Sequence, residues 1–151
     1  MKFATANVTS WPGCQRAAQG LDLDGYDLVL LQEVKITSEM DYKLHGWARR
    51  QGWKAALSPS TITPAGGFSG GAAVMARKHI PLSLPPGSDS TCREAGRVAA
   101  AIVRAGPCGG FIAVSSYLFI GEGLSERNVG IVQRTAKWLF TLDRPFLWGC
   151  E

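Results

Sequence analysis

Short apolar segments alternate with turn-forming residues along most of the chain. Runs of four to eight apolar residues bounded by Gly, Pro, Asn or charged residues are typical of buried β-strands. The strands that this pattern predicts are 2–7, 26–32, 53–58, 70–77, 96–105, 109–119 and 146–149. The two strands that flank the GPCGG segment are predicted to pair as a hairpin through it.

Two helical segments are expected in the first third of the chain. One or two helical turns are predicted around Gln15–Gln19. A longer helix is predicted over 37–51, with Thr37 or Ser38 as its N-cap and Gly52 at its end. Both lie between predicted strands, so strands and helices alternate here.

The longest predicted helix lies near the end of the sequence, over 125–143. Ser125 is its expected N-cap, and Pro145 prevents the helix from continuing. The apolar face is predicted to consist of Val129, Val132, Ala136, Leu139 and Phe140. Helices mixed with strands and a central hairpin predict an α/β fold with mixed sheets (α+β), not a purely parallel doubly wound one.

Composition and charge say little about the class of protein or its function. The 151 residues suit a single domain, with 46% hydrophobic and 19% charged residues. The net charge of +4 is compatible with a nucleic-acid partner but is weak evidence for one. Because the chain has neither a long apolar run nor a signal-peptide core, we expect an intracellular protein of the nucleus or cytoplasm that is not secreted. Neither a membrane nor an obligate protein partner is expected.

The cysteines do not predict a metal or disulfide framework. They are Cys14, Cys92, Cys108 and Cys150, and their spacing contains no C-x-x-C pair and no zinc-type cluster. A chain of this length does not need disulfides to be stable. We therefore expect reduced thiols with structural roles.

Asn7 and Glu33 each stand at the carboxyl end of a predicted buried strand. If the two strands are neighbours, both side chains emerge at the same edge of the sheet. One carboxylate beside one carboxamide oxygen suits Mg²⁺, which binds hard oxygens and keeps several waters. The alternatives are structural: Glu33 pairs with nearby Lys35, and Asn7 hydrogen-bonds a turn.

The order of the segments carries a resemblance that no single motif carries. TANVTSW is followed by DLVLLQEVKIT, GGFSGGAAVMAR, GRVAAAIV, VSSYLFIGEG, SERNVGIVQRTAKWL and RPFLWGCE. This series resembles the endonuclease/exonuclease/phosphatase superfamily, in the branch of exonuclease III-like apurinic endonucleases and non-LTR retrotransposon endonucleases. The resemblance covers essentially the whole chain but only the N-terminal part of such a domain. It implies that residues 1–151 are one incomplete domain, the N-terminal part of a four-layer α/β/β/α sandwich.

The resemblance implies roles for individual residues. Glu33 is similar to the family's metal-binding Glu, and Asn7 to the Asn that lies near the metal and the scissile phosphate. Tyr117 resembles the active-site Tyr of the N-x-Y-x-P segment, although Phe119 stands where the family often has Pro. Arg97 resembles a basic residue that faces phosphate.

The same comparison identifies departures from the family pattern. Glu151 stands where the family has the Asp of Gly-Asp-x-Asn, so it is a candidate catalytic stand-in. The Asn of that motif and the later Ser-Asp-His segment have no counterpart in the sequence. The abrupt end after a strand favours the interpretation that the chain is a fragment.

The expected activity is that of the complete family domain, a phosphodiesterase that depends on Mg²⁺ or Mn²⁺ and cuts DNA. The alternatives are a catalytically dead retroelement fragment and a remnant that binds nucleic acid without cleaving it. The chain as written is expected to be inactive if nothing supplies the missing groups.

Two further features have competing interpretations. GGFSGG, at 66–71, superficially suggests a phosphate-binding loop, but it lacks the Lys-Ser/Thr pair and a following helix. We interpret it as a hairpin turn, with Gly70 and Gly71 leading into the next strand. Trp11 is suited equally to stacking on a base and to packing in the core.

Overall fold

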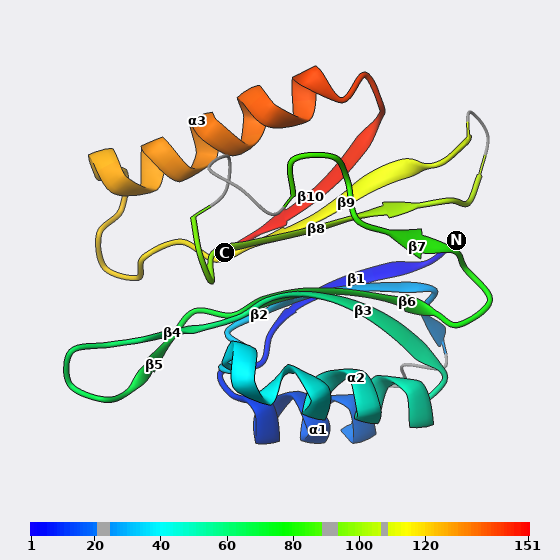
Figure 1. The fold of residues 1–151 in the computed structure, drawn as a ribbon, viewed down its shortest axis with the longest axis horizontal. Helices are drawn as coiled ribbons and strands as arrows, with labels where there is room; N and C mark the ends of the chain where they lie inside the picture. Colours follow the sequence, from blue (N-terminus) through cyan, green and yellow to red (C-terminus); the bar gives the residue numbers. More distant parts are fainter. Residues whose placement is uncertain (21–24, 89–93, 107–108) are drawn as a thin grey trace.

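The computed structural model describes residues 1–20, 25–88, 94–106 and 109–151, arranged as two stacked sheets with helices on their outer faces (Figure 1). The first sheet has the order β1 (Phe3–Asn7), β2 (Leu28–Gln32), β6 (Ala72–Arg77), β3 (Trp53–Ser58). The second has the order β10 (Phe146–Cys150), β9 (Phe111–Ser116), β8 (Val98–Val103), β7 (Leu82–Ser83). A separate hairpin consists of β4 (Thr61–Ile62) and β5 (Phe68–Ser69).

Both sheets mix parallel and antiparallel neighbours, as the sequence predicted. In the first sheet β1 and β2 are parallel, and β6 is antiparallel to both β2 and β3. In the second, β8 and β9 form the predicted antiparallel pair, and β10 runs parallel to β9. The turn residues 107–108 of that hairpin lie outside the described residues.

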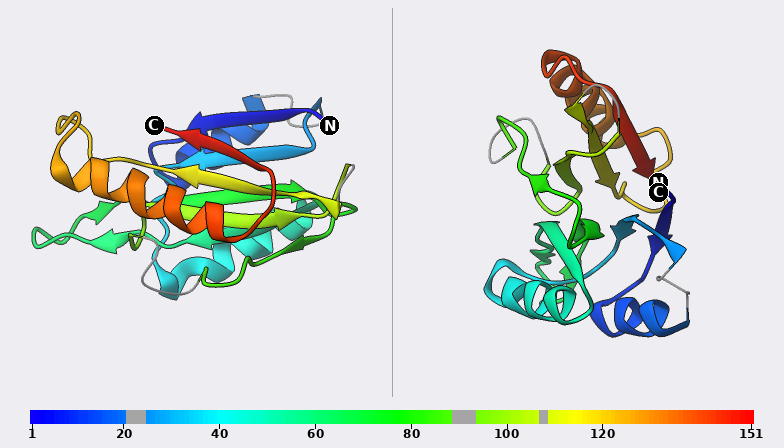
Figure 2. Two further views of the ribbon diagram at one scale, coloured as in Figure 1. Left: turned by 90° about the horizontal axis from the view of Figure 1, so that it is seen from above. Right: turned by 90° about the vertical axis from the view of Figure 1, so that its right-hand side faces the viewer.

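Helices cover the outer face of each sheet (Figure 1). α1 (Trp11–Gly20) and α2 (Asp41–Arg50) contribute Cys14, Leu44 and Trp47 to one apolar cluster with the first sheet. α3 (Glu126–Thr141) contributes Ile131, Trp138 and Leu139 to another cluster with the second sheet. The view from the side shows the same succession of helices, sheet, sheet and helix (Figure 2).

The interface between the two sheets is built largely from small side chains. Its buried members include Ala56, Ala72, Ala76, Ala99, Ala101 and Ala113. Short side chains let two sheets approach closely, and at Gly149 of β10 an added Cβ would lie 2.8 Å from Leu30 Cδ1. Polar side chains from facing sheets can therefore reach each other near the strand ends.

Two of the predicted helix starts need correction. The first helix begins at Trp11, earlier than the predicted turns at Gln15–Gln19. The second begins with a 3₁₀ turn, Ser38–Met40, and neither that turn nor α2 has a side-chain cap hydrogen bond, so Thr37 and Ser38 do not act as predicted. Gly52, with φ of 77°, does follow the helix end as expected.

The predicted apolar face of the last helix was wrong. Of its five residues only Leu139 is buried, whereas Phe140 is 76% exposed. The buried face also includes the polar Asn128 and Thr135. Asn128 bonds the main chain of the loop before the helix, and this contact fixes a rotation that apolar spacing alone does not reveal.

Candidate functional site

The two strand ends that carry Asn7 and Glu33 are neighbours, which is the condition under which both side chains share one edge of the sheet. Parallel pairing of β1 and β2 places Asn7 beside Gln32, the residue before Glu33. Immediately beyond the strands, Thr9, Glu33 and Lys35 have positive φ values of 57°, 56° and 52°. Residues other than Gly rarely adopt this backbone conformation. Each such residue lowers the free energy of unfolding by on the order of 1–3 kcal/mol. The surrounding structure must therefore hold the segment after β2 in place.

Glycines supply part of that support. The N–H groups of Val34 and Lys35 donate to the carbonyl oxygens of Gly71 and Gly70, at 3.0 and 3.3 Å. Gly71 in turn donates to the Gly96 carbonyl oxygen at 2.7 Å. A Cβ on Gly70 would collide with that same carbonyl oxygen. Gly70 and Gly71 thus form the expected entry into β6 and also bind the Glu33 segment through the backbone.

A buried polar network ties the two sheets together beneath Glu33. Gln32 Nε2 donates to Ser115 Oγ on β9 at 2.8 Å, and Ser115 Oγ donates to the Leu31 carbonyl oxygen at 2.8 Å. Thr5 of β1 also hydrogen-bonds the Gln32 side chain. Ser115 is fully buried and Gln32 is 2% exposed. This network fixes the end of β2 relative to the end of β9.

Tyr117 follows β9 and meets Glu33 across the sheet interface. Burial raises the pKa of Tyr117, as do the hydrogen bond that its hydroxyl donates to Glu33 and the negative charge of that carboxylate. The side chain is 4% exposed. The hydroxyl therefore stays protonated at neutral pH and acts as a hydrogen-bond donor.

The structural alternatives considered for Asn7 and Glu33 are also present. Asn7 Oδ1 accepts a hydrogen bond of 2.8 Å from the Thr9 N–H, which is a turn contact. Lys35 Nζ lies 3.7 Å from Glu33 Oε1. Glu33 retains solvent access, with 14% of its side chain exposed. These contacts hold both oxygen-bearing side chains at the surface of the strand ends without burying them.

Arg97 was expected to face phosphate from the start of a strand. In the structure its side chain is buried. It is 3% exposed, its Nη2 donates to Ser69 Oγ at 2.6 Å, and its guanidinium lies 3.7 Å from the Phe119 ring centroid. Burial lowers the pKa of Arg97. Its positive charge lowers the pKa of Tyr117, which opposes the effect of burial and of Glu33.

Glu151 lies beside Tyr117 through backbone pairing. The Glu151 N–H donates to the Ser116 carbonyl oxygen at 3.2 Å, and Leu118 N–H donates to a main-chain oxygen of Glu151 at 2.7 Å. Its charge is a further, smaller cause of the raised pKa of Tyr117. The structure thus brings Glu33, Tyr117, Arg97 and Glu151 into one neighbourhood.

Several supporting residues were not predicted from the sequence. Ser69 and Ser115 hold the site residues but belong to no recognised catalytic pattern, and Gln32, which precedes the metal-binding Glu in the family pattern, was given no role of its own. The one available signal was the polar Gln32 within an apolar strand, because a buried polar side chain needs a partner. Trp11 packs edge-on against Trp47, at 5.5 Å between ring centroids, which favours its core role.

Metal-ligating side chains are sparse in the part of the chain that the structure describes. No group of three His, Cys, Asp or Glu side chains there is placed to hold an ion. Cys14 is buried and Cys150 exposed, both as free thiols, whereas Cys92 and Cys108 lie outside the described residues. The oxygens of Glu33 and Asn7 still fit Mg²⁺, which needs only one or two carboxylates and retains waters.

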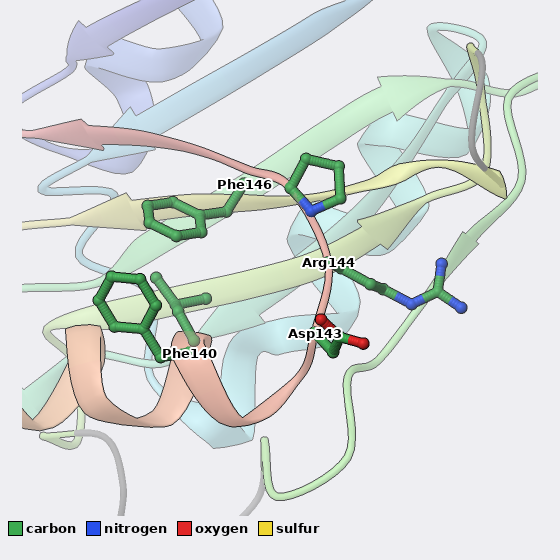
Figure 3. A pocket seen from close by; sticks show the side chains of 6 residues that line it. Phe140, Asp143, Arg144 and Phe146 are labelled. Atoms are coloured by element: carbon green, nitrogen blue, oxygen red, sulfur yellow. The ribbon is translucent and has the colours of Figure 1, made fainter.

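A pocket of about 490 Å³ lies at the opposite end of β10 from Glu151 (Figure 3). It is lined by Leu139, Phe140, Asp143, Arg144, Pro145 and Phe146. Phe140 and Phe146 pack edge-on with ring centroids 6.0 Å apart. The pocket offers no cluster of acids, so the strand ends are the better candidate for chemistry.

Among the helices of the described residues, none has the length and apolar character that a membrane span requires.

Comparison with known proteins identifies the fold. The endonuclease domain of TRAS1, a telomere-specific non-LTR retrotransposon, superposes with a TM-score of 0.62 at 12% identity, over 97% of this chain and 56% of that one. The AP endonuclease LMAP from Leishmania major gives a TM-score of 0.64 at 17% identity, over 98% of this chain and 54% of that one. No family model and no curated protein matches. The chain has the endonuclease/exonuclease/phosphatase fold and spans about half the length of these solved structures.

Proposed function

We propose that this chain carries the Glu33 half of a divalent-metal-dependent phosphodiesterase site that cuts DNA. The observation that supports this most directly is the hydrogen bond of 2.8 Å from Gln32 Nε2 to Ser115 Oγ, which joins the two strand ends that carry Glu33 and Tyr117. These strand ends belong to a fold shared with an AP endonuclease and a retrotransposon endonuclease, both named for nucleic-acid cleavage. Nucleic acid is accordingly the proposed substrate class.

Glu33 and Asn7 are the proposed ligands of Mg²⁺ or Mn²⁺. Glu33 has an accessible carboxylate, and Asn7 ends the adjacent parallel strand. Lys35, near Glu33, would have to move aside when a cation binds, because like charges repel. When bound, the ion would neutralise charge that develops on the phosphoryl group.

The other residues have proposed roles in hydrolysis of the phosphodiester. A water oxygen bonds to phosphorus, and the bond from phosphorus to the leaving ester oxygen breaks. The proton of the attacking water passes to a carboxylate, and the leaving oxygen takes a proton from a solvent water. Glu151 is the proposed acceptor of that proton. Tyr117, kept protonated by burial and Glu33, is the proposed donor of a hydrogen bond to the phosphate. Arg97 is the proposed source of positive charge behind Tyr117, although its burial keeps it from the solvent.

A remnant that binds nucleic acid without cleaving it is the alternative. The observation that favours it is the Lys35 ammonium, which lies 3.7 Å from the Glu33 carboxylate and already pairs with the acid that a metal ion would need. Binding of this kind would weaken steeply with salt, since contacts to phosphates release counterions.

The substitution Glu33→Gln tests the proposal, because it removes the charge and preserves the shape. We expect Mn²⁺ affinity, measured by electron paramagnetic resonance, to fall at least about tenfold, the lower end of what even outer-shell changes cost a metal site. Glu39→Gln, at an exposed acid of the 3₁₀ turn, is the matched control and should bind as the unmodified chain does.

Cleavage is measured on duplex DNA that contains an abasic site, with Mg²⁺ and with a chelator. Metal-dependent cleavage that Glu33→Gln abolishes supports the phosphodiesterase. Salt-sensitive DNA binding without cleavage supports the alternative. Equal Mn²⁺ affinity in the Gln variant and its control would overturn the assignment of Glu33 as a ligand.

A further inference from the structure

Phe119 lies between two arginine side chains, and this arrangement is called here the Phe119 stack. The guanidinium carbon of Arg97 lies 3.7 Å from the ring centroid and that of Arg127 lies 3.3 Å from it. Two guanidinium groups this close to one centroid cannot share a face of the ring, so they occupy opposite faces. Attraction between a cation and the electron-rich face of an aromatic ring therefore acts on both sides of Phe119.

The two arginines come from different elements. Arg97 directly precedes β8 and reaches the β4–β5 hairpin through its hydrogen bond of 2.6 Å to Ser69 Oγ. Arg127 lies in the first turn of α3, with Glu94 and Glu122 at 3.9 and 4.0 Å. These acids offset the repulsion that two cations so close together would otherwise exert. The Phe119 stack thus connects the hairpin, the start of β8 and the start of α3.

The main chain of Phe119 is fixed independently of its ring. Asn128 Oδ1 accepts a hydrogen bond of 2.8 Å from the Phe119 N–H, and Asn128 Nδ2 donates to the Phe119 carbonyl oxygen at 3.0 Å. Asn128 is 2% exposed. A loop residue held at its N–H, its carbonyl and both faces of its ring has little freedom to move.

Tyr117 is two residues away and shares these supports. The Arg97 guanidinium also lies 5.1 Å from the Tyr117 ring centroid, and the Arg97 carbonyl oxygen accepts the Tyr117 N–H at 2.8 Å. One arginine therefore touches both rings and anchors the backbone between them. Any shift of Phe119 should move the Tyr117 hydroxyl relative to Glu33.

We infer that Phe119 is a positioning residue that, through its stack with Arg97 and Arg127, holds Tyr117 against Glu33. Its meaning for catalysis rests on the proposed function, but the positioning itself is a property of the folded chain. Arg97 accordingly acts within the fold, on the aromatic rings, and reaches substrate through Tyr117.

The test uses the full chain with tyrosine rings labelled with ¹³C and a soluble paramagnetic agent that broadens exposed signals. Tyr117 is buried and Tyr42 is 63% exposed, so the chain contains its own reference for exposure. We expect Phe119→Leu, which keeps apolar bulk but has no aromatic face, to broaden the Tyr117 signal towards that of Tyr42. Phe119→Trp, which keeps the aromatic faces, should restore protection.

Two more variants keep the test decisive if Phe119→Leu fails to fold. Arg127→Gln changes only one face of the Phe119 stack and should raise the broadening of Tyr117 less than Phe119→Leu does. Leu124→Ala, at a 92% exposed residue of the same loop, is the control and should leave Tyr117 protected. Unchanged protection of Tyr117 in Arg127→Gln and in any folded Phe119→Leu would overturn the inference.

Kinetics separate this inference from the proposed function. If the chain cleaves DNA, Phe119→Leu should lower kcat about five- to tenfold, as expected for loss of both cation–π contacts of the Phe119 stack, and leave KM unchanged. A fall in kcat with Tyr117 still protected would also count against the positioning role. Loss of Tyr117 protection in a chain that never cleaves DNA supports the positioning role and contradicts the proposed function.

Discussion

The strand ends that carry Glu33 and Tyr117 differ sharply from the opposite end of β10, where Phe146 lies. At the strand ends, polar groups are buried and paired: Gln32 is 2% exposed and bonds across the sheet interface. At the far end, apolar rings are exposed, with Phe140 at 76% and Phe146 at 39% (Figure 3). Hydrogen bonds of side chains and backbone hold the polar groups of the first region, whereas the exposed rings of the second contact each other edge-on.

This contrast indicates that the strand ends depend on a fixed backbone conformation. Positive φ values at Thr9, Glu33 and Lys35 are tolerated because neighbouring backbone groups hold the segment. Strain that is held so firmly is typical of functional sites. Substitutions at the strand ends should therefore cost far more stability than substitutions of the exposed rings of Phe140 and Phe146.

The largest effect is expected from Gly70→Ala. Gly70 has φ of 77°, and an added Cβ would collide with the Gly96 carbonyl oxygen, so strain and steric overlap combine. We expect the free energy of unfolding to fall by about 4 kcal/mol. Gly66→Ala is the matched control, because Gly66 also has φ of 77° but has no heavy atom near its Cβ position, and should cost about 1–2 kcal/mol. Equal losses in urea denaturation would show that close packing at Gly70 contributes nothing.

An intermediate, pH-dependent effect is expected at Cys14. Burial beneath the first sheet raises the pKa of the Cys14 thiol from 9.0 to about 12. The folded chain keeps this proton when the unfolded chain loses it, so stability is fully present below pH 9 and falls as pH rises through this interval. We expect a slope that approaches about 1.4 kcal/mol per pH unit, and Cys14→Ala should remove it.

Urea denaturation between pH 8 and about 10 measures the onset of this slope, because stability is constant below pH 9 and falls above it. Cys150→Ala is the control, since the Cys150 side chain at the end of β10 is exposed to water in the folded chain. A slope that is the same in Cys14→Ala and in the unmodified chain would contradict the burial argument.

The smallest effect is expected from Phe140→Ala, in the exposed apolar region. Loss of its edge-on contact with Phe146 should cost about 0.5–1 kcal/mol. The neighbouring Leu139 is 1% exposed, and Leu139→Ala should cost about 2–5 kcal/mol because it leaves a cavity. Thermal unfolding of the two variants compares two adjacent residues of one helix, of which Leu139 is buried and Phe140 is exposed. A larger loss of stability in Phe140→Ala than in Leu139→Ala would show that Phe140 is buried, as the apolar spacing predicted.

The sequence by itself determined the longer strands and the place of two site residues at strand ends. The run 28–31 is apolar throughout, which favours burial on both faces, and β2 is fully buried. Asn7 and Glu33 were each predicted at a strand end because polar residues directly follow apolar runs, and the register of the structure places Asn7 beside Gln32. An apolar run followed by a polar residue depends only on nearby residues, so it can be recognised from the sequence.

Only the tertiary structure decided which distant residues meet. Arg97 was expected at the surface but is buried against Phe119 and Ser69, and the α3 face was assigned wrongly because Asn128 fixes its rotation. The contact of Gln32 with Ser115 joins residues 83 positions apart. Such contacts depend on how closely two alanine-rich sheets pack, and no spacing along the chain encodes that distance.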